Sequence, residues 1–91
     1  MSAVVKLPTQ LRAAAGGAAH VDVTGGTVAE VLEQLFTLHG ELRERLCDED
    51  GVLRRFVNVY VCGEDIRFGD ALQTQVPDGA EIQILPAVAG G

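Results

Sequence analysis

The residues best suited to chemistry in this 91-residue chain stand at its C-terminal end, where small uncharged residues lead to Gly90 and Gly91. Glycine has no Cβ to crowd a reagent that approaches the carbonyl carbon, and its backbone adopts angles closed to other residues. We therefore expect the terminal carboxylate of Gly91 to be a substrate for another protein. Fully extended, residues 86–91 span about 20 Å, enough to enter an active site. The residues expected to enter it are Ala87, Val88, Ala89 and Gly90.

The other reactive side chains form no recognisable catalytic or metal-binding pattern. The two histidines and two cysteines lack the close pairing of zinc ligands, and no histidine has a nucleophile at a recognisable triad spacing. Cys47 and Cys62 are expected to be reduced and partly buried rather than disulfide-bonded. No basic residue is placed by the sequence to activate the Cys62 thiol. We expect no catalytic residue, no metal site and no cofactor bound by the chain itself.

Composition excludes several classes of ligand. Seven Lys and Arg against thirteen Asp and Glu give a net charge of −6, which repels nucleic acid and anionic lipid and attracts basic partners. Three Phe, one Tyr and no Trp offer few rings on which bases could stack. The sequence has no apolar run long enough to span a membrane and no signal-peptide pattern after Met1. We expect a cytoplasmic domain that binds neither nucleic acid nor membranes.

One small domain must position the C-terminal residues. Residues 3–7 are rich in β-branched side chains and are followed by Pro8, which predicts a first strand. Residues 20–24 alternate polar and apolar side chains, which predicts a second strand paired with the first. The Ala-rich stretch between them, broken by Gly16 and Gly17, is expected to be a connecting loop.

A helix is predicted after the second strand. Thr27 and Glu30 have the spacing of a capping box, and apolar residues follow at helical spacing as far as Phe36. Gly40 is well placed to end this helix. A weaker helical turn is expected over residues 41–47, before an acidic loop.

Two further strands complete the predicted fold. Residues 56–62 alternate, with valines on the face expected to meet the helix, and a turn is expected over 63–65. Residues 81–85 form the last predicted strand, which stops before Pro86. This order predicts an α+β, ubiquitin-like β-grasp domain, with a mixed sheet of about four to five strands and one main helix on one face. We expect this domain to comprise residues 1–85, followed by a flexible tail over residues 86–91, called the tail below.

The chain resembles the ubiquitin-like sulfur-carrier family of the ThiS and MoaD type, to which the thiamin and molybdopterin carriers belong. The resemblance covers nearly the whole chain. Its strand FVNVYV at 56–61, its segment EDIRF at 64–68 and its ending ILPAVAGG at 84–91 are most similar to the CysO-like branch that serves cysteine biosynthesis. It implies that an ATP-dependent, ubiquitin-activating-like enzyme adenylates Gly91. Sulfide or a persulfide then replaces AMP and leaves a thiocarboxylate at the C-terminus.

The same resemblance implies that the chain is a carrier acted on by partner enzymes rather than an enzyme. Its client would be a sulfur-accepting synthase, with pyridoxal phosphate in the cysteine branch, followed by a metal-dependent protease that releases the product. Thiosugar or thiamin-like clients are equally compatible with one thiocarboxylate donor. A monomer is expected, because the tail must enter several enzymes. Two alternatives stay open: a protein modifier that forms isopeptide bonds through Gly91, and a β-grasp interaction module with an inert tail.

A docking surface for the activating enzyme is expected on the strand over residues 56–62. Phe56 and Tyr60 lie on the side opposite the valines and form a small apolar patch if no helix covers that side. The alternative is a small apolar cluster beneath a loop. Four arginines near the middle of the chain are expected to be solvated rather than to bind phosphate, namely Arg43, Arg45, Arg54 and Arg55.

Overall fold

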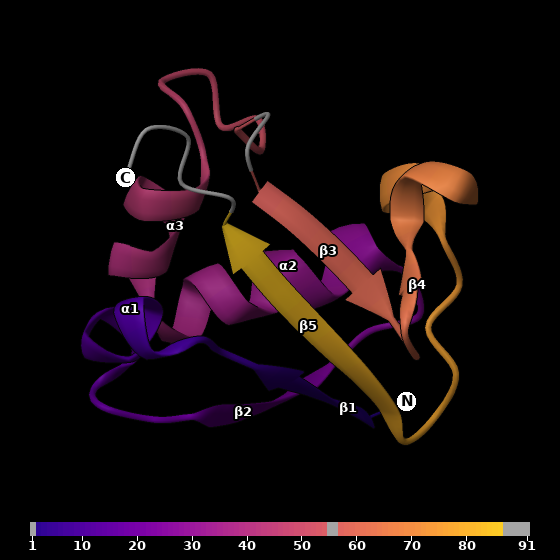
Figure 1. Ribbon diagram of the computed structural model, residues 1–91, viewed down its shortest axis with the longest axis horizontal. Helices are drawn as coiled ribbons and strands as arrows, with labels where there is room; N and C mark the ends of the chain where they lie inside the picture. Colours follow the sequence, from indigo (N-terminus) through magenta and orange to yellow (C-terminus); the bar gives the residue numbers. More distant parts are fainter. Residues whose placement is uncertain (1, 55–56, 87–91) are drawn as a thin grey trace.

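The computed structural model describes residues 2–54 and 57–86, which form a five-stranded sheet with helices (Figure 1). The strands and helices are β1 (Ser2–Lys6), α1 (Thr9–Arg12), β2 (His20–Thr24), α2 (Val28–Leu38), α3 (Gly40–Leu46), β3 (Val57–Val61), β4 (Glu64–Asp65) and β5 (Ala80–Pro86). Three short 3-10 turns are η1 (Ala13–Ala15), η2 (Ile66–Phe68) and η3 (Ala71–Gln73).

The sheet is mixed and has the strand order β2-β1-β5-β3-β4. β1 pairs antiparallel with β2 and parallel with β5, and β3 pairs antiparallel with both β5 and β4. In Figure 1, α2 crosses behind the sheet and no helix covers β3 and β5 on the near side. The predicted β-grasp architecture, with its main helix on one face, is confirmed.

The core lies between α2 and the sheet. The predicted valine row of β3 is buried, with 2% of Val59 exposed, and Ile82 and Ile84 of β5 are fully buried. The helix contributes an apolar stripe because its buried residues recur at three- and four-residue intervals. Its N-terminus is fixed by the predicted capping box between Thr27 and Glu30. Across the described ranges, every helix is too short or too polar to cross a membrane.

Two elements differ from the sequence-based prediction in the first half of the chain. The stretch expected to be a loop contains α1, whose Leu11 is buried in the core. Packing of Leu11 therefore orders a segment with little helical signal of its own. Gly40 does not simply end a helix: α2 stops at Leu38, and Gly40 is the first residue of α3.

The hairpin after β3 also differs from the prediction. The turn lies at Cys62 and Gly63, whose φ angles of 51° and 86° suit the type I′ turn of a two-residue hairpin. Residues 64 and 65, expected in the turn, form β4 instead. β5 also includes Pro86, which lies opposite Val57. Pro86 has no N–H to donate and none is needed there, because the Val57 carbonyl accepts from the Arg67 guanidinium and the Val57 N–H donates to the Arg54 carbonyl.

Candidate functional site

The structure defines where the tail leaves the domain. β5 runs between β1 and β3, and its last residue, Pro86, is the first residue of the tail. The predicted reactive residue, Gly91, lies outside the described residues. So do the four residues expected to enter an active site, Ala87, Val88, Ala89 and Gly90. Backbone pairing on both sides and the buried side chains of Ile82 and Ile84 anchor β5. The tail is therefore attached to one of the best-buried strands of the domain.

The helix-free face of the sheet carries the predicted docking residue Tyr60, which is half-buried. Tyr60 pairs with Gln83 of β5, and the next pair along the same face is Asn58 with Leu85. Leu85 is 42% exposed and lies beside the origin of the tail. Phe56, the other predicted docking residue, lies outside the described residues.

Leu85 extends the exposed apolar surface beside Tyr60, and the sequence carried a usable signal for its exposure. In β5, Ile82 and Ile84 face the core, so Leu85 must point to the opposite face. A salt bridge with 2.9 Å between Lys6 Nζ and Glu81 Oε2 borders the same face. This face therefore combines a small apolar area with both signs of charge.

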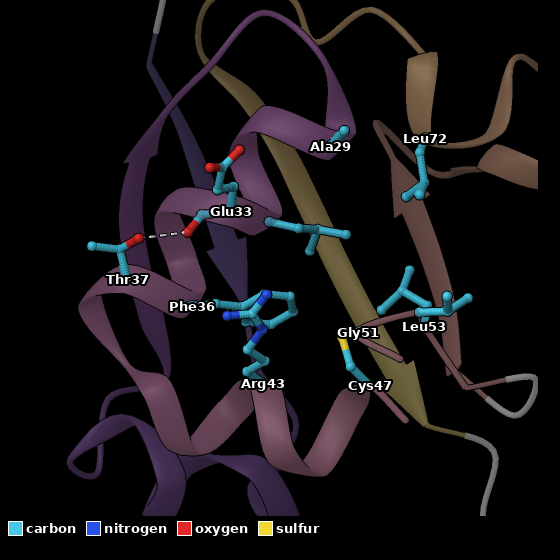
Figure 2. Close-up of a pocket in the computed structure, with 11 residues that line it drawn as sticks. Ala29, Glu33, Phe36, Thr37, Arg43, Cys47, Gly51, Leu53 and Leu72 are labelled. Atoms are coloured by element: carbon cyan, nitrogen blue, oxygen red, sulfur yellow. Dashed lines mark hydrogen bonds between the residues drawn. The ribbon is translucent and has the colours of Figure 1, made fainter. Parts of the chain in front are cut away.

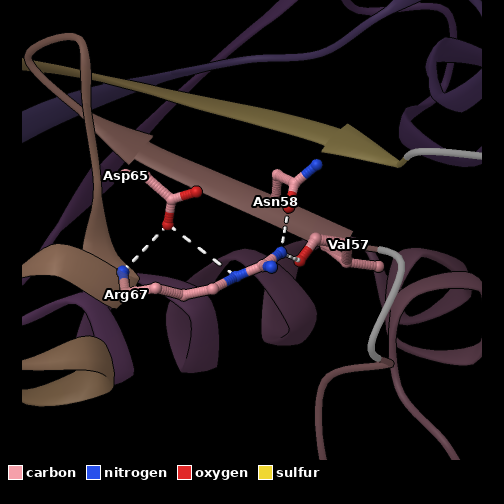
Figure 3. Close-up of polar contacts among 4 residues, drawn as sticks. All are labelled: Val57, Asn58, Asp65 and Arg67. Atoms are coloured by element: carbon pink, nitrogen blue, oxygen red, sulfur yellow. Dashed lines mark hydrogen bonds and ion pairs between the residues drawn. The ribbon is translucent and has the colours of Figure 1, made fainter.

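Arg67 braces the strand beside the tail (Figure 3). Its guanidinium donates to the Val57 carbonyl at 3.3 Å and to the side-chain oxygen of Asn58. The Asp65 carboxylate accepts from the Arg67 backbone N–H at 2.9 Å and lies 3.8 Å from its Nε. Because Val57 pairs with Pro86, these contacts connect the loop after β4 to the strand that borders the tail.

Replacing Arg67 by alanine should lower the free energy of unfolding by about 1 kcal/mol, because two hydrogen bonds to a charged but solvent-exposed group are lost. Arg67→Lys should recover part of this loss, since lysine retains the charge without the planar fork of donors. Urea denaturation of the three proteins measures the difference. Equal stability of the wild type and Arg67→Ala would show that the brace contributes nothing.

The two cysteines are free thiols with different surroundings. Cys47 is buried, whereas Cys62 is exposed at the hairpin turn, so the prediction of partly buried thiols is right only for Cys47. Burial raises the pKa of Cys47, the Arg43 charge opposes this shift, and the Asp48 charge adds to it. Within the described residues, no group of three His, Cys, Asp or Glu side chains could hold a metal ion.

In the native protein, iodoacetamide should alkylate Cys62 and spare Cys47, because only an accessible thiolate reacts quickly.

The raised pKa of Cys47 also makes the stability of the protein depend on pH. As pH rises past the pKa of the unfolded thiol, the unfolded state loses its proton first, so stability falls at alkaline pH. Peptide mapping after alkylation, and urea denaturation of wild type and Cys47→Ala from neutral to alkaline pH, check both points. Alkylation of Cys47 at the rate of Cys62 would contradict the assignment.

Comparison with known proteins identifies the family. The model of the ThiS family matches residues 5–91. The chain is 44% identical over 93 residues to sulfur carrier protein CysO of Mycobacterium tuberculosis, covering 100% of both chains.

Solved structures agree with that match. CysO in the Amycolatopsis orientalis BexX/CysO complex superposes with a TM-score of 0.87 at 44% identity, covering 98% of this chain and 99% of the other. SAMP1 of Haloferax volcanii superposes with a TM-score of 0.87 at 32% identity, covering 100% of both chains. With the matching sequence, sheet order and C-terminal Gly-Gly, the chain belongs to the ThiS family.

Proposed function

We propose that this protein carries sulfur as a thiocarboxylate on Gly91 and donates it in the biosynthesis of cysteine or of another sulfur-containing metabolite. The observation that carries this proposal is the 44% identity to the Mycobacterium tuberculosis sulfur carrier over the full length of both chains. The region matched by the family model extends to Gly91, the residue whose carboxylate is the proposed reactive group.

A carboxylate must be activated before it can accept sulfur. In the proposed first step, a Gly91 carboxylate oxygen attacks the α-phosphate of ATP, and pyrophosphate leaves. The product is an acyl adenylate, a mixed anhydride whose leaving group is AMP. Hydrosulfide then attacks the Gly91 carbonyl carbon, the C–O bond to AMP breaks, and a C-terminal thiocarboxylate forms. The partner enzyme supplies ATP binding and catalysis, and the carrier supplies an accessible carboxylate.

The folded domain has a separate task, which is recognition. β5 connects the tail to the sheet, so a partner that docks on the domain finds the tail at a fixed origin. Tyr60 and Leu85 on the helix-free face are the proposed contact residues for the activating enzyme. A net charge of −6 favours basic partner surfaces over nucleic acid. The related CysO of Amycolatopsis orientalis was crystallised in a complex with BexX.

The thiocarboxylate is a soft nucleophile held on a protein, so sulfur reaches the client without release of free sulfide. For a cysteine-forming client, the proposed acceptor is an aminoacrylate on pyridoxal phosphate in a synthase, and a metal-dependent protease then frees cysteine from the carrier. We place these reactions in the cytoplasm, because the activation step consumes ATP.

Intact-mass spectrometry tests the proposal. The protein is incubated with its cognate activating enzyme, ATP and a sulfide donor, and with each component omitted in turn. The account predicts replacement of one oxygen by sulfur only in the complete mixture. An unchanged mass in that mixture, with pyrophosphate release also absent, would reject the carrier function.

A protein modifier is the second candidate, and the superposition with SAMP1 of Haloferax volcanii is the observation in its favour. A modifier would use the same activated Gly91 but transfer it to lysine amines. Immunoblotting of cells that express the tagged protein separates the two functions. Higher-mass conjugates that disappear in a variant lacking Gly91 indicate a modifier, whereas a carrier leaves none.

A further inference from the structure

A hollow lies between α2, α3 and the segment that follows α3 (Figure 2). Phe36 of α2, Arg43 of α3 and Leu53 border it, and Leu72 faces it from η3. Its walls are mainly apolar, and it opens to solvent.

A second hollow continues the first toward the sheet. The two share Val52, Leu53 and Leu72 in their walls, and the second adds Arg54 and Val57. The two hollows are therefore adjacent and extend from α2 and α3 to the start of β3; together they are called the arginine groove below.

Basic side chains outnumber acidic ones in the walls of this groove, unlike in the whole protein. Arg43, Arg54 and Arg67 line it, which is three of the seven Lys and Arg in a chain of net charge −6. Glu33 is the only Asp or Glu among its described lining residues. Asp65 lies beside Arg67, and the exposed Asp48, Glu49 and Asp50 stand between the lining residues Cys47 and Gly51. These carboxylates offset part of that charge. The groove therefore favours an acidic ligand where most of the surface repels one.

The groove also exposes apolar surface. Val52 is 58% exposed and Leu72 is 38% exposed. The edge of β3 beside them is not free, because the Val57 N–H donates to the Arg54 carbonyl and the Val57 carbonyl accepts from the Arg67 guanidinium. The exposed apolar side chains are therefore the part of the groove that favours contact with another protein.

The position of the groove points to the partner. Val57 lies in its wall and pairs with Pro86, where the tail begins. An enzyme that takes the tail into its active site must therefore approach this end of the groove. We propose that the arginine groove docks an acidic and apolar segment of the enzyme that activates Gly91, an inference that rests on the proposed function.

Two arginines on α3 provide a matched test. Arg43 lines the groove, whereas Arg45 is absent from its walls and pairs with Glu41 at 3.4 Å. Arg43→Glu and Arg45→Glu change the net charge equally on the same helix. Arg43→Glu should raise the Kd for the activating enzyme about tenfold, and Arg45→Glu less than about twofold. Leu72→Asp, which leaves α3 intact, should weaken binding to a similar extent as Arg43→Glu.

Calorimetric titration of each full-length variant with the activating enzyme, without ATP, gives these Kd values. Equal weakening by Arg43→Glu and Arg45→Glu, or no binding by the wild type, overturns the inference. Binding with the predicted ratio but no adenylation supports the groove and contradicts the proposed function, so the two failures are distinct.

NMR spectra of the carrier alone test other occupants. Shifts of the Leu53 and Leu72 amides that depend on carrier concentration would indicate a second copy of the chain. Shifts that depend on salt but not on concentration would indicate the protein's own tail. Either result overturns the proposal, and shifts that appear only when the enzyme is added support it.

Discussion

Deleting Gly91, or adding one alanine after it, should reduce thiocarboxylate formation by more than about a hundredfold, since a reacting group misplaced by about 1 Å already costs that much. Each change moves the terminal carboxylate by about 3.5 Å along the tail. The free energy of unfolding should not change, because the buried core cluster of the described residues extends only from Ala3 to Ile84. Intact-mass kinetics with the activating enzyme and urea denaturation measure the two quantities.

Gly91→Ala is the matched control for this prediction. It keeps the length of the tail and the terminal carboxylate and adds only a Cβ beside the reacting carbonyl. We expect a rate between those of the wild type and the deletion variant. If the deletion variant forms a thiocarboxylate at the wild-type rate, Gly91 is not the reactive residue.

Replacing Ile82 by alanine should have the opposite effect: a large decrease in the free energy of unfolding and little change in the rate of thiocarboxylate formation. Ile82 is fully buried in β5, where it pairs with Val5 on one side and Val61 on the other. Truncation of such a side chain costs about 2–5 kcal/mol through lost burial and the cavity left behind. At a temperature where the variant is folded, its rate of thiocarboxylate formation should stay within about twofold of the wild-type rate, because the tail carries the reactive group.

Gln83→Ala is the control, since Gln83 directly follows Ile82 in β5 and points to the helix-free face. Its free energy of unfolding should change by less than about 0.5 kcal/mol, as is usual for surface substitutions. Equal destabilisation by the two substitutions in urea denaturation would contradict the assignment of Ile82 to the core.

The elements predicted correctly from the sequence are those with strong local signals. β2 has strict alternation, and α2 has a capping box followed by an apolar stripe, so neighbouring residues determine both. α1 and β4 were missed because they depend on distant contacts. α1 is ordered by burial of Leu11, and the two residues of β4 are recognisable only once β3 lies beside them.

The candidate site divides in the same way. Gly91 could be proposed from the chemistry of the C-terminal residues and from the family resemblance, without any structure. The contact of Arg67 with Val57 joins residues from separate elements and has no signature in the local sequence. The arginine groove likewise gathers side chains from α3, from the segment before β3 and from η2. Such juxtapositions follow from the topology of the sheet and cannot be found from sequence spacing.

Fragmentation of the sulfur-loaded protein in the mass spectrometer tests the central claim most directly, because it locates the added sulfur. The account predicts that an oxygen is exchanged for sulfur within the C-terminal fragment that contains Gly91. The same exchange should occur in a variant in which Cys47 and Cys62 are both serine. Sulfur that is added to a cysteine as a persulfide, with no exchange at Gly91, would contradict the account.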